Sequence, residues 1–317
     1  MQPLTSITLP GRRQREAASK LLTIHNPKVK PSRPSNPLRV VCISDTHNTR
    51  PILPPGDLLI HAGDLTENGS FEEVQAELKW LSDQPHTYKV LIAGNHDVLL
   101  DEAFLTKYPE RRYGLSKTKA DLDWDSVIYL EDSCIALDFP PTEPIRDVTP
   151  SSEPRRLTIF GSPWTPRYGT SAFQYRPDDE LHWSTRFSSL DTKPDIIITH
   201  GPPKHHLDTR DFHRAGCPYL AEEIAQIRPR LVVSGHIHVS YGREDVVLDG
   251  VQRAYEEVMT GWAGWMTVGW MAILVLLAKL KGLVLPALSQ ERTVFVNASV
   301  VSGPKNVLTN EPIVVEL

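Results

Sequence analysis

Short runs of aliphatic residues, each ending in polar residues, recur along the chain from Leu38 onward. Runs of about four to six β-branched and aliphatic residues are typical of strands buried on both faces of a sheet. Stretches between several of these runs place apolar residues three and four positions apart, which predicts helices with one buried face. The predicted strands lie within 38–48, 57–64, 88–97, 156–164, 195–203, 231–238 and 293–300, and the predicted helices within 71–84, 179–190 and 219–229.

The alternation of strands and helices indicates an α/β fold. Strands that alternate with helices pair mainly in parallel, and their crossover connections are right-handed. We therefore expect a single α/β domain over residues 38–317. The stretch 138–156 holds five prolines and is predicted to be a surface loop between two strands.

Residues 1–37 differ from the rest of the chain in charge and in proline content. They hold seven Lys or Arg residues against the single acidic residue Glu16, and prolines recur from Pro27 to Pro37. This composition predicts a disordered basic arm. A mitochondrial presequence and a patch for anionic lipid are alternatives that an Arg-rich, acid-poor segment leaves open.

An apolar insertion at about 255–288 does not fit the pattern of the other segments. Residues 259–278 contain no charge, and Lys279 and Lys281 follow, so the segment is long enough to span a membrane. Spanning would place two predicted core strands on opposite sides of the bilayer. We therefore expect residues 259–285 to form a hydrophobic helix or hairpin at a membrane interface or an oligomer contact, with a buried helix as the open alternative. If this segment lies at a membrane interface, we expect the lipid headgroups to be contacted by Trp262, Trp265 and Trp270.

The net charge and the cysteine content of the chain limit which partners and which cellular compartment are expected. A net charge of -5, from 34 basic and 39 acidic residues, argues against dedicated nucleic-acid binding, which normally requires a basic surface. A small-molecule partner is expected instead. Three scattered cysteines favour a reducing compartment, and the first residues lack the apolar core of a secretory signal. We expect a cytoplasmic protein and leave membrane association open.

Polar residues follow five of the predicted strands directly. Each residue alone is weak evidence, because a strand-end His or Asp is often structural. Together they are informative, because the carboxyl ends of strands in open α/β sheets face one common crevice. These residues are Asp45, His47, Asp64, Asn95, His96, Asp97, His200, His236 and His238.

The donor atoms of this set indicate the kind of ion they would bind. Carboxylates, an amide oxygen and imidazoles, with no thiolate, suit Mn, Fe, Zn or Ni. Even seven ligands from these nine residues would exceed what one ion with open positions needs, but seven suit two ions about 3.5–4 Å apart that share a carboxylate. Such a pair holds the attacking and leaving oxygens of a phosphoryl transfer.

The ordered motifs DTH, GD, GNHD, THG and GHIH resemble those of the calcineurin-like metallophosphoesterase superfamily from about Val40 to the C-terminus. The stretches GDLTENG, FGSPWTP, HGPP and NAS resemble its metallophosphoesterase-domain-containing subgroup, which includes class III phosphodiesterases. Protein Ser/Thr phosphatases are less similar, because their second motif carries an Arg in a GDxVDRG pattern, where this chain has Leu65 to Asn68. The resemblance implies a four-layer α/β/β/α sandwich of two mixed sheets, with a dinuclear metal site at the C-terminal ends of strands.

The resemblance also implies roles for individual residues. One metal would be bound by Asp45, His47, Asp64 and His238, and the second by the bridging Asp64 with Asn95, His200 and His236. His96 would act as general acid or as an electrostatic stabiliser. Asp97 would fix the tautomer of His96 or serve in loop structure. Asn48, His205 and His206 are candidates for contacts with phosphate or base.

The function implied is hydrolysis of a phosphoester by a hydroxide that two divalent or trivalent ions activate. A phosphodiester of nucleotide type is expected, including 2′,3′- or 3′,5′-cyclic nucleotides. A phosphomonoesterase or protein phosphatase remains an alternative. A non-catalytic membrane- or protein-docking scaffold and a nuclease also remain open, although a nuclease would require a basic groove.

Overall fold

The structure is a computed structural model that describes residues 11–25, 37–112, 114, 116–140, 155–210, 213–261, 263–284 and 292–317. The chain divides into two compact units. Met1–Ser32 and Val246–Thr293 belong to the first unit, and Arg33–Asp245 and Val294–Leu317 belong to the second. This division differs from the predicted single domain with an insertion over 255–288, because the N-terminal segment and the insertion belong to one unit.

The second unit contains two large sheets. One has the order β17-β1-β2-β3-β4, in which β1 to β4 are parallel neighbours and β17 is antiparallel to β1. Its strands are Arg39–Ile43 (β1), Leu58–Ala62 (β2), Tyr88–Ile92 (β3), Val127–Tyr129 (β4) and Ile313–Glu316 (β17). The parallel core of this sheet agrees with the prediction from alternating strands and helices.

The other large sheet has the order β13-β14-β12-β9-β6-β5. Within it β6, β9, β12 and β14 are parallel, and β5 is antiparallel to β6. The strands are Ser133–Phe139 (β5), Arg155–Ser162 (β6), Ile196–Thr199 (β9), Leu231–Ser234 (β12), Gly242–Val246 (β13) and Thr293–Asn297 (β14). Asp138 and Phe139 pair with Arg156 and Arg155, so both ends of the predicted 138–156 loop belong to strands; residues 141–154 lie outside the described part of the chain.

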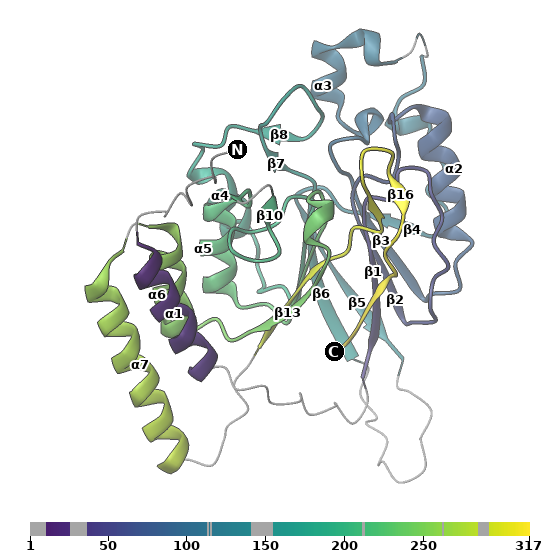
Figure 1. Ribbon diagram of the computed structural model, residues 1–317. Helices are drawn as coiled ribbons and strands as arrows, with labels where there is room; N and C mark the ends of the chain where they lie inside the picture. The colour runs from purple at the N-terminus through teal and green to yellow at the C-terminus, as the bar shows by residue number, and fades with distance from the viewer. Residues whose placement is uncertain are drawn as a thin grey trace, which may run out of the picture. The chain divides into compact units, whose positions relative to one another are not determined.

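The two sheets pack face to face and helices cover their outer faces (Figure 1). The layer between the sheets includes Val40 and Ile60 from one sheet and Ile159 and Val233 from the other. Helix α2 (Phe71–Ser82) covers the far side of the first sheet, whereas α4 (Leu181–Ser188) and α5 (Pro218–Ile227) lie beside the second. The predicted four-layer α/β/β/α sandwich of two mixed sheets is confirmed.

Helix α2 shows why these elements form where they do. Ser70 caps its first turn and Glu73 bonds back to the backbone of Ser70, which completes a capping box. Phe71, Val74 and Leu78, spaced three and four residues apart, are buried against the first sheet. Shorter elements complete the unit: α3 (Glu102–Lys107), η1 (Val98–Leu100), η2 (Pro109–Arg112), η3 (Lys119–Asp121), η4 (His238–Ser240), β7 (Thr165–Pro166), β8 (Gln174–Tyr175), β10 (Thr209–Arg210), β11 (His213–Arg214), β15 (Val301–Ser302) and β16 (Val307–Leu308).

The described residues of the first unit form three helices, α1 (Arg12–His25), α6 (Gly250–Thr260) and α7 (Trp265–Val284), which pack against one another. Helix α1 corrects the prediction of a disordered segment for Arg12–His25. Ala18 is buried among α6 and α7, and Leu21 and Leu22 pack beside it. The prolines that suggested disorder follow this helix in the sequence, and residues 1–10 and 26–36 lie outside the described part.

Helices α6 and α7 occupy most of the predicted apolar insertion. Trp262 lies outside the described residues, whereas Trp265 and Trp270 are both more than half exposed on α7. Among the residues that the structure describes, no helix combines the length and hydropathy needed to cross a bilayer. The interfacial and oligomer-contact expectations for 259–285 remain predictions.

Candidate metal centre

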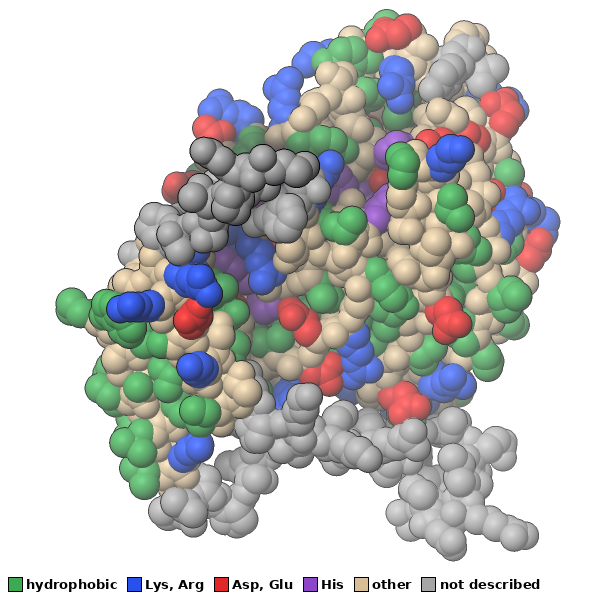
Figure 2. Space-filling view, in the orientation of Figure 1, with side chains coloured by type: hydrophobic (Ala, Val, Ile, Leu, Met, Phe, Trp, Pro, Cys, Tyr) green, Lys and Arg blue, Asp and Glu red, His purple; other side chains and the backbone are tan. Residues whose placement is uncertain are grey.

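The predicted ligands follow the C-terminal ends of strands from both large sheets. Sharp turns at these strand ends give a left-handed backbone conformation to Asp45, His47, Asp64 and His236, with φ values of 54°, 43°, 52° and 65°. Non-glycine residues adopt this conformation rarely, and such residues cluster at functional sites. The turns bring together side chains that are almost two hundred positions apart in sequence, and Figure 2 shows histidine and acidic side chains close together at the surface.

One group of potential ligands contains Asp45, His47 and His238, whose donor atoms all lie within 4.8 Å of one another. His238 Nε2 is 3.1 Å from Asp45 Oδ1. The other Asp45 oxygen accepts a hydrogen bond of 2.8 Å from Ser299 Oγ. Both Asp45 oxygens also accept from the backbone N–H of His236, at 3.1 and 3.0 Å. These contacts hold the carboxylate in a fixed orientation.

A second group contains Asp64, His200 and His236, within the same limit of 4.8 Å. His200 Nε2 is 3.2 Å from Asp64 Oδ2 and 3.1 Å from Asn95 Oδ1. Asp64 Oδ2 is also 3.8 Å from His47 Nε2 of the first group. One oxygen of Asp64 therefore lies between the two groups, as the bridging role would require.

Two glycines allow the loops to approach these carboxylates. A Cβ atom on Gly235 would collide with Asp45 Oδ2 and with the Ser44 hydroxyl. A Cβ atom on Gly94 would collide with Asp64 Oδ1 and with the Asp64 backbone nitrogen. Glycine at both positions is therefore a requirement of close packing around the ligands.

The electrostatics of the site require positive charge beside the buried carboxylates. Burial opposes the charged form of His200, but the negative charge of Asp64 and their hydrogen bond outweigh it and raise the pKa of His200 to about 9. Burial likewise raises the pKa of Asp45, yet the hydrogen bond from His238 and the charge of His200 lower it overall. Burial and the charge of His200 lower the pKa of His236 to about 3, so this imidazole stays neutral and can donate its lone pair.

These residues fit a pair of metal ions. The Nε2 atom of His47 is buried and has no hydrogen-bond partner among the described residues, which is costly unless a ligand occupies its lone pair. His200 Nδ1 lies 2.9 Å from the carbonyl oxygen of Ala62, which would hold a proton on Nδ1 and leave Nε2, beside Asp64, as the atom that could bind an ion. The oxygen and nitrogen donors suit the same first-row metals that the sequence indicated.

His96 and Asp97 lie beside the ligands, and the side chains have different hydrogen-bond partners. His96 Nδ1 lies 2.7 Å from the carbonyl oxygen of Glu67. The Asp97 carboxylate instead accepts hydrogen bonds from the backbone of Leu65, Thr66 and Gly94. These contacts agree with the loop role expected as an alternative for Asp97, and its effect on the His96 tautomer remains a prediction.

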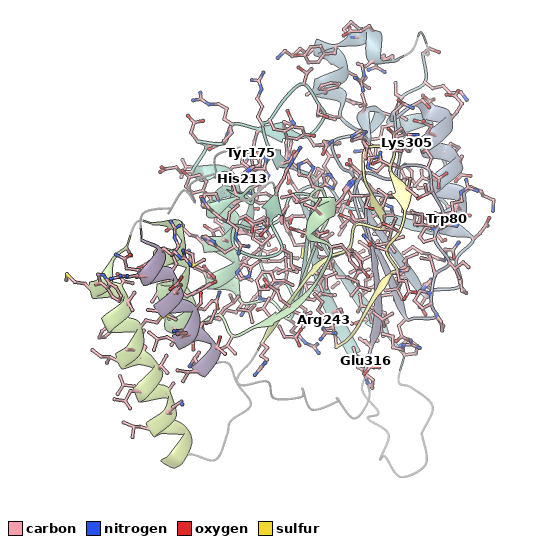
Figure 3. The ribbon with its side chains drawn as sticks, in the orientation of Figure 1. Trp80, Tyr175, His213, Arg243, Lys305 and Glu316 are labelled. Atoms are coloured by element: carbon pink, nitrogen blue, oxygen red, sulfur yellow. The ribbon has the colours of Figure 1, made fainter. Side chains whose placement is uncertain are left out.

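Two residues near the ligands make supporting contacts that the sequence did not predict. Ser299, in the NAS stretch, donates to Asp45 Oδ2. The Glu67 carboxylate lies 3.1 Å from His47 Nδ1 and accepts a hydrogen bond from Asn306, which follows the labelled Lys305 in Figure 3. Single sequence patterns do not reveal such supporting contacts, because the partners are far apart in the chain.

The three predicted substrate contacts have different surroundings. His206 is buried, stacks on Phe295 and lies 2.7 Å from Glu244, and its role in substrate binding remains a prediction. The exposed Asn48 donates its side-chain amide to Glu73 at 2.9 Å. His205 is half-buried, and its role remains a prediction.

Comparison with known proteins places this architecture in a family. The family model described as "Calcineurin-like phosphoesterase" matches residues 38–240, well over half of the chain. The chain therefore belongs to the calcineurin-like phosphoesterase family, whose members as a class are metal-dependent phosphoester hydrolases.

The chain is also similar to proteins with other names. It is 40% identical over 285 residues, 89% of its length, to "Probable rhamnogalacturonate lyase C" of Emericella nidulans. It is 37% identical over 227 residues, 69% of its length, to "Metallophosphoesterase domain-containing protein 1" of Homo sapiens. The aligned regions cover 24% and 65% of these two relatives, so the chain spans only part of each.

Proposed function

We propose that this protein is a metal-dependent phosphodiesterase that acts on a small nucleotide-type substrate. The observation that carries the proposal is the pair of ligand groups that meet at Asp64. The groups contain Asp45, His47 and His238 on one side and Asp64, His200 and His236 on the other. Asn95 belongs with the second group because its amide oxygen lies beside His200 Nε2.

Two bound ions would supply an activated water nucleophile and positive charge for the phosphoryl oxygens. The seven side chains named above would hold them. His96 would supply a proton to the leaving oxygen from Nε2, because Nδ1 is directed at the Glu67 carbonyl. Burial lowers the pKa of His96, but the charge of Asp64 and the Glu67 carbonyl outweigh burial and raise it.

Tyr168 supports a substrate with an aromatic group. Its ring centroid lies 5.2 Å from that of His236, and the residue is 55% exposed. The segment that carries it is tied to the site, because Ser171 Oγ and the Ala172 N–H donate to the carbonyl of Asn95. An exposed aromatic ring beside a metal ligand can stack on a nucleobase, which contributes about 1–3 kcal/mol in single-stranded nucleic-acid complexes.

The test is a comparison of diesters with different leaving groups. His96→Ala should lower kcat for a 2′,3′-cyclic nucleotide by about 10²–10⁴-fold. The same variant should affect bis-4-nitrophenyl phosphate much less, because nitrophenolate leaves without a proton. Tyr168→Ala should raise KM for nucleotides about tenfold or more while Tyr168→Phe retains wild-type KM.

Metal content, measured by mass spectrometry on each variant, controls for loss of the ions. If His96→Ala lost the same fraction of activity on the cyclic nucleotide and on bis-4-nitrophenyl phosphate, His96 would not act as the general acid. Hydrolysis of monoesters but not of diesters by metal-loaded protein would replace the proposal with a phosphomonoesterase. Absence of turnover on the whole panel would support the scaffold alternative.

A further inference from the structure

Helix α7 buries only one narrow side against the other helices of its unit. Val268, Met271 and Val275 are buried in the cluster that α7 forms with α1 and α6. The remaining surface is apolar as well. Six large side chains, each 49% exposed or more, form what we call the apolar face of α7: Trp265, Met266, Trp270, Ile273, Leu276 and Leu280.

The width of the apolar face indicates what covers it. Met266, Trp270 and Ile273 are four and three residues apart, the spacing of a seam for one partner helix. Trp265 and Leu276 form a second row, in which Gly269 and Ala272 are also exposed. A partner helix would cover one row and leave the other in water, whereas a lipid surface covers both.

The charges around the apolar face complement an anionic surface. No acidic residue occurs in Trp265–Val284, and Lys279 is exposed near its end. Helix α1, which packs on α7, exposes Arg13 and Lys20, while its one acid, Glu16, pairs with Arg12 at 2.8 Å. This basic character is local, because the whole chain has a net charge of -5.

The third helix of the unit carries the acidic residues Glu256 and Glu257 and one basic residue, Arg253, which pairs with Glu257 at 3.4 Å. Each helix of the unit packs against the other two. A flat surface that contacts both α1 and α7 therefore lies on the side of the unit opposite α6. Figure 2 shows hydrophobic and basic side chains together on the visible side of these helices. The side formed by α1 and α7 therefore combines apolar area with positive charge.

We propose that the apolar face of α7 and the basic side chains of α1 form a docking surface for a bilayer that contains anionic lipid. Trp265 and Trp270 lie at headgroup level, and the aliphatic side chains enter the upper acyl region. Arg13 and Lys20 contact lipid phosphates and carboxylates. A second copy of the chain would bring the same positive side chains into its interface, where like charges oppose association.

The test is co-sedimentation of the full chain with vesicles. Vesicles of phosphatidylcholine with about one third phosphatidylserine should pellet the protein, and pure phosphatidylcholine should pellet much less. The double variant Trp270→Ser, Leu276→Ser should lose binding. The double variant Arg13→Glu, Lys20→Glu should weaken binding to the anionic vesicles by about fivefold or more for each residue, because each basic side chain near such a surface contributes about 1 kcal/mol.

Matched controls use residues outside the docking surface. Ile52→Ser removes an apolar side chain that is 94% exposed in the other unit, and Lys193→Glu reverses an exposed charge there. Both controls should bind vesicles as the wild type does. Equal binding by the α7 double variant, or equal binding to neutral and anionic vesicles, would overturn the proposal.

A second measurement needs no substitution. Phosphatidylcholine brominated on its acyl chains, mixed with phosphatidylserine, should quench part of the tryptophan fluorescence of the wild-type protein. Absence of quenching would overturn the proposal. The proposal would also be overturned if the wild-type protein formed a dimer in light scattering and did not bind anionic vesicles, while the double variant Trp270→Ser, Leu276→Ser was a monomer.

Discussion

Asp97 shows how one buried side chain can position several metal ligands. Its carboxylate is fully buried and joins the loop after β2 to the loop after β3 through the backbone of Leu65, Thr66 and Gly94. Burial and the nearby charge of Asp64 raise the pKa of Asp97 to about 6 despite these hydrogen bonds. The same two loops present Asp64 and Asn95, so Asp97 acts on the site through the backbone.

Asp97→Ala should lower the free energy of unfolding by about 3 kcal/mol, because it leaves buried N–H donors without an acceptor. It should also weaken metal binding, since both loops lose their common anchor. Denaturant unfolding and metal titration measure the two effects. The exposed Asp191→Ala is the control and should change stability by less than about 0.5 kcal/mol. Wild-type stability in Asp97→Ala would contradict this account of the loops.

At the scale of elements, Asp249 connects two helices of the first unit. Its carboxylate caps α6 by accepting from the N–H groups of Val251 and Gln252, at 2.9 and 3.1 Å. Its other oxygen is 2.7 Å from His25 Nε2 at the end of α1. Burial raises the pKa of Asp249, but the hydrogen bond from His25 and the helix N–H groups lower it overall.

Asp249→Ala should destabilise the three-helix unit by about 1–2 kcal/mol through loss of the cap, whereas Asp249→Asn retains a capping side chain. Folding lowers the pKa of the Asp249 carboxyl. The charged carboxylate therefore adds to the stability of the folded state above the unfolded pKa of about 4, and this stabilisation is lost as pH falls through the lower, folded-state pKa. Hydrogen exchange of the α6 amides over this pH range is the measurement. Equal acid sensitivity of the wild type and the Asn variant would count against the charge contribution.

The same unit shows where sequence patterns were insufficient. Ala17, Ala18, Leu21 and Leu22 in α1 have helical spacing, but the flanking prolines and basic composition favoured disorder. Packing against α6 and α7 stabilises this helix, and those partners lie more than two hundred residues away in the chain. Such a tertiary contribution overrides local composition and is not visible in a single sequence.

At the scale of the whole metal site, the sequence predicted the convergence of ligands better than their surroundings. Strand periodicity and polar strand ends predicted that Asp45, Asp64 and His200 meet. Asp45 and Asp64 follow neighbouring parallel strands of one sheet, whereas His200 follows a strand of the other sheet, so their meeting also depends on how the two sheets pack. The contacts of Ser299 with Asp45 and of Glu67 with His47 depend on how loops fold over that edge. The burial of His206 against Phe295 of β14 likewise depends on how the loop between β9 and β10 folds.

The most direct test of the paired metal site is the number of ions that each protein chain binds. Chelator-treated protein titrated with Mn²⁺ and analysed by mass spectrometry should bind two ions per chain. Asp64→Asn should bind at most one, because its oxygen lies between both ligand groups, while the exposed Asp191→Ala should still bind two. Wild-type protein that binds no more than one ion, or an Asp64→Asn variant that retains two with unchanged affinity, would contradict the account.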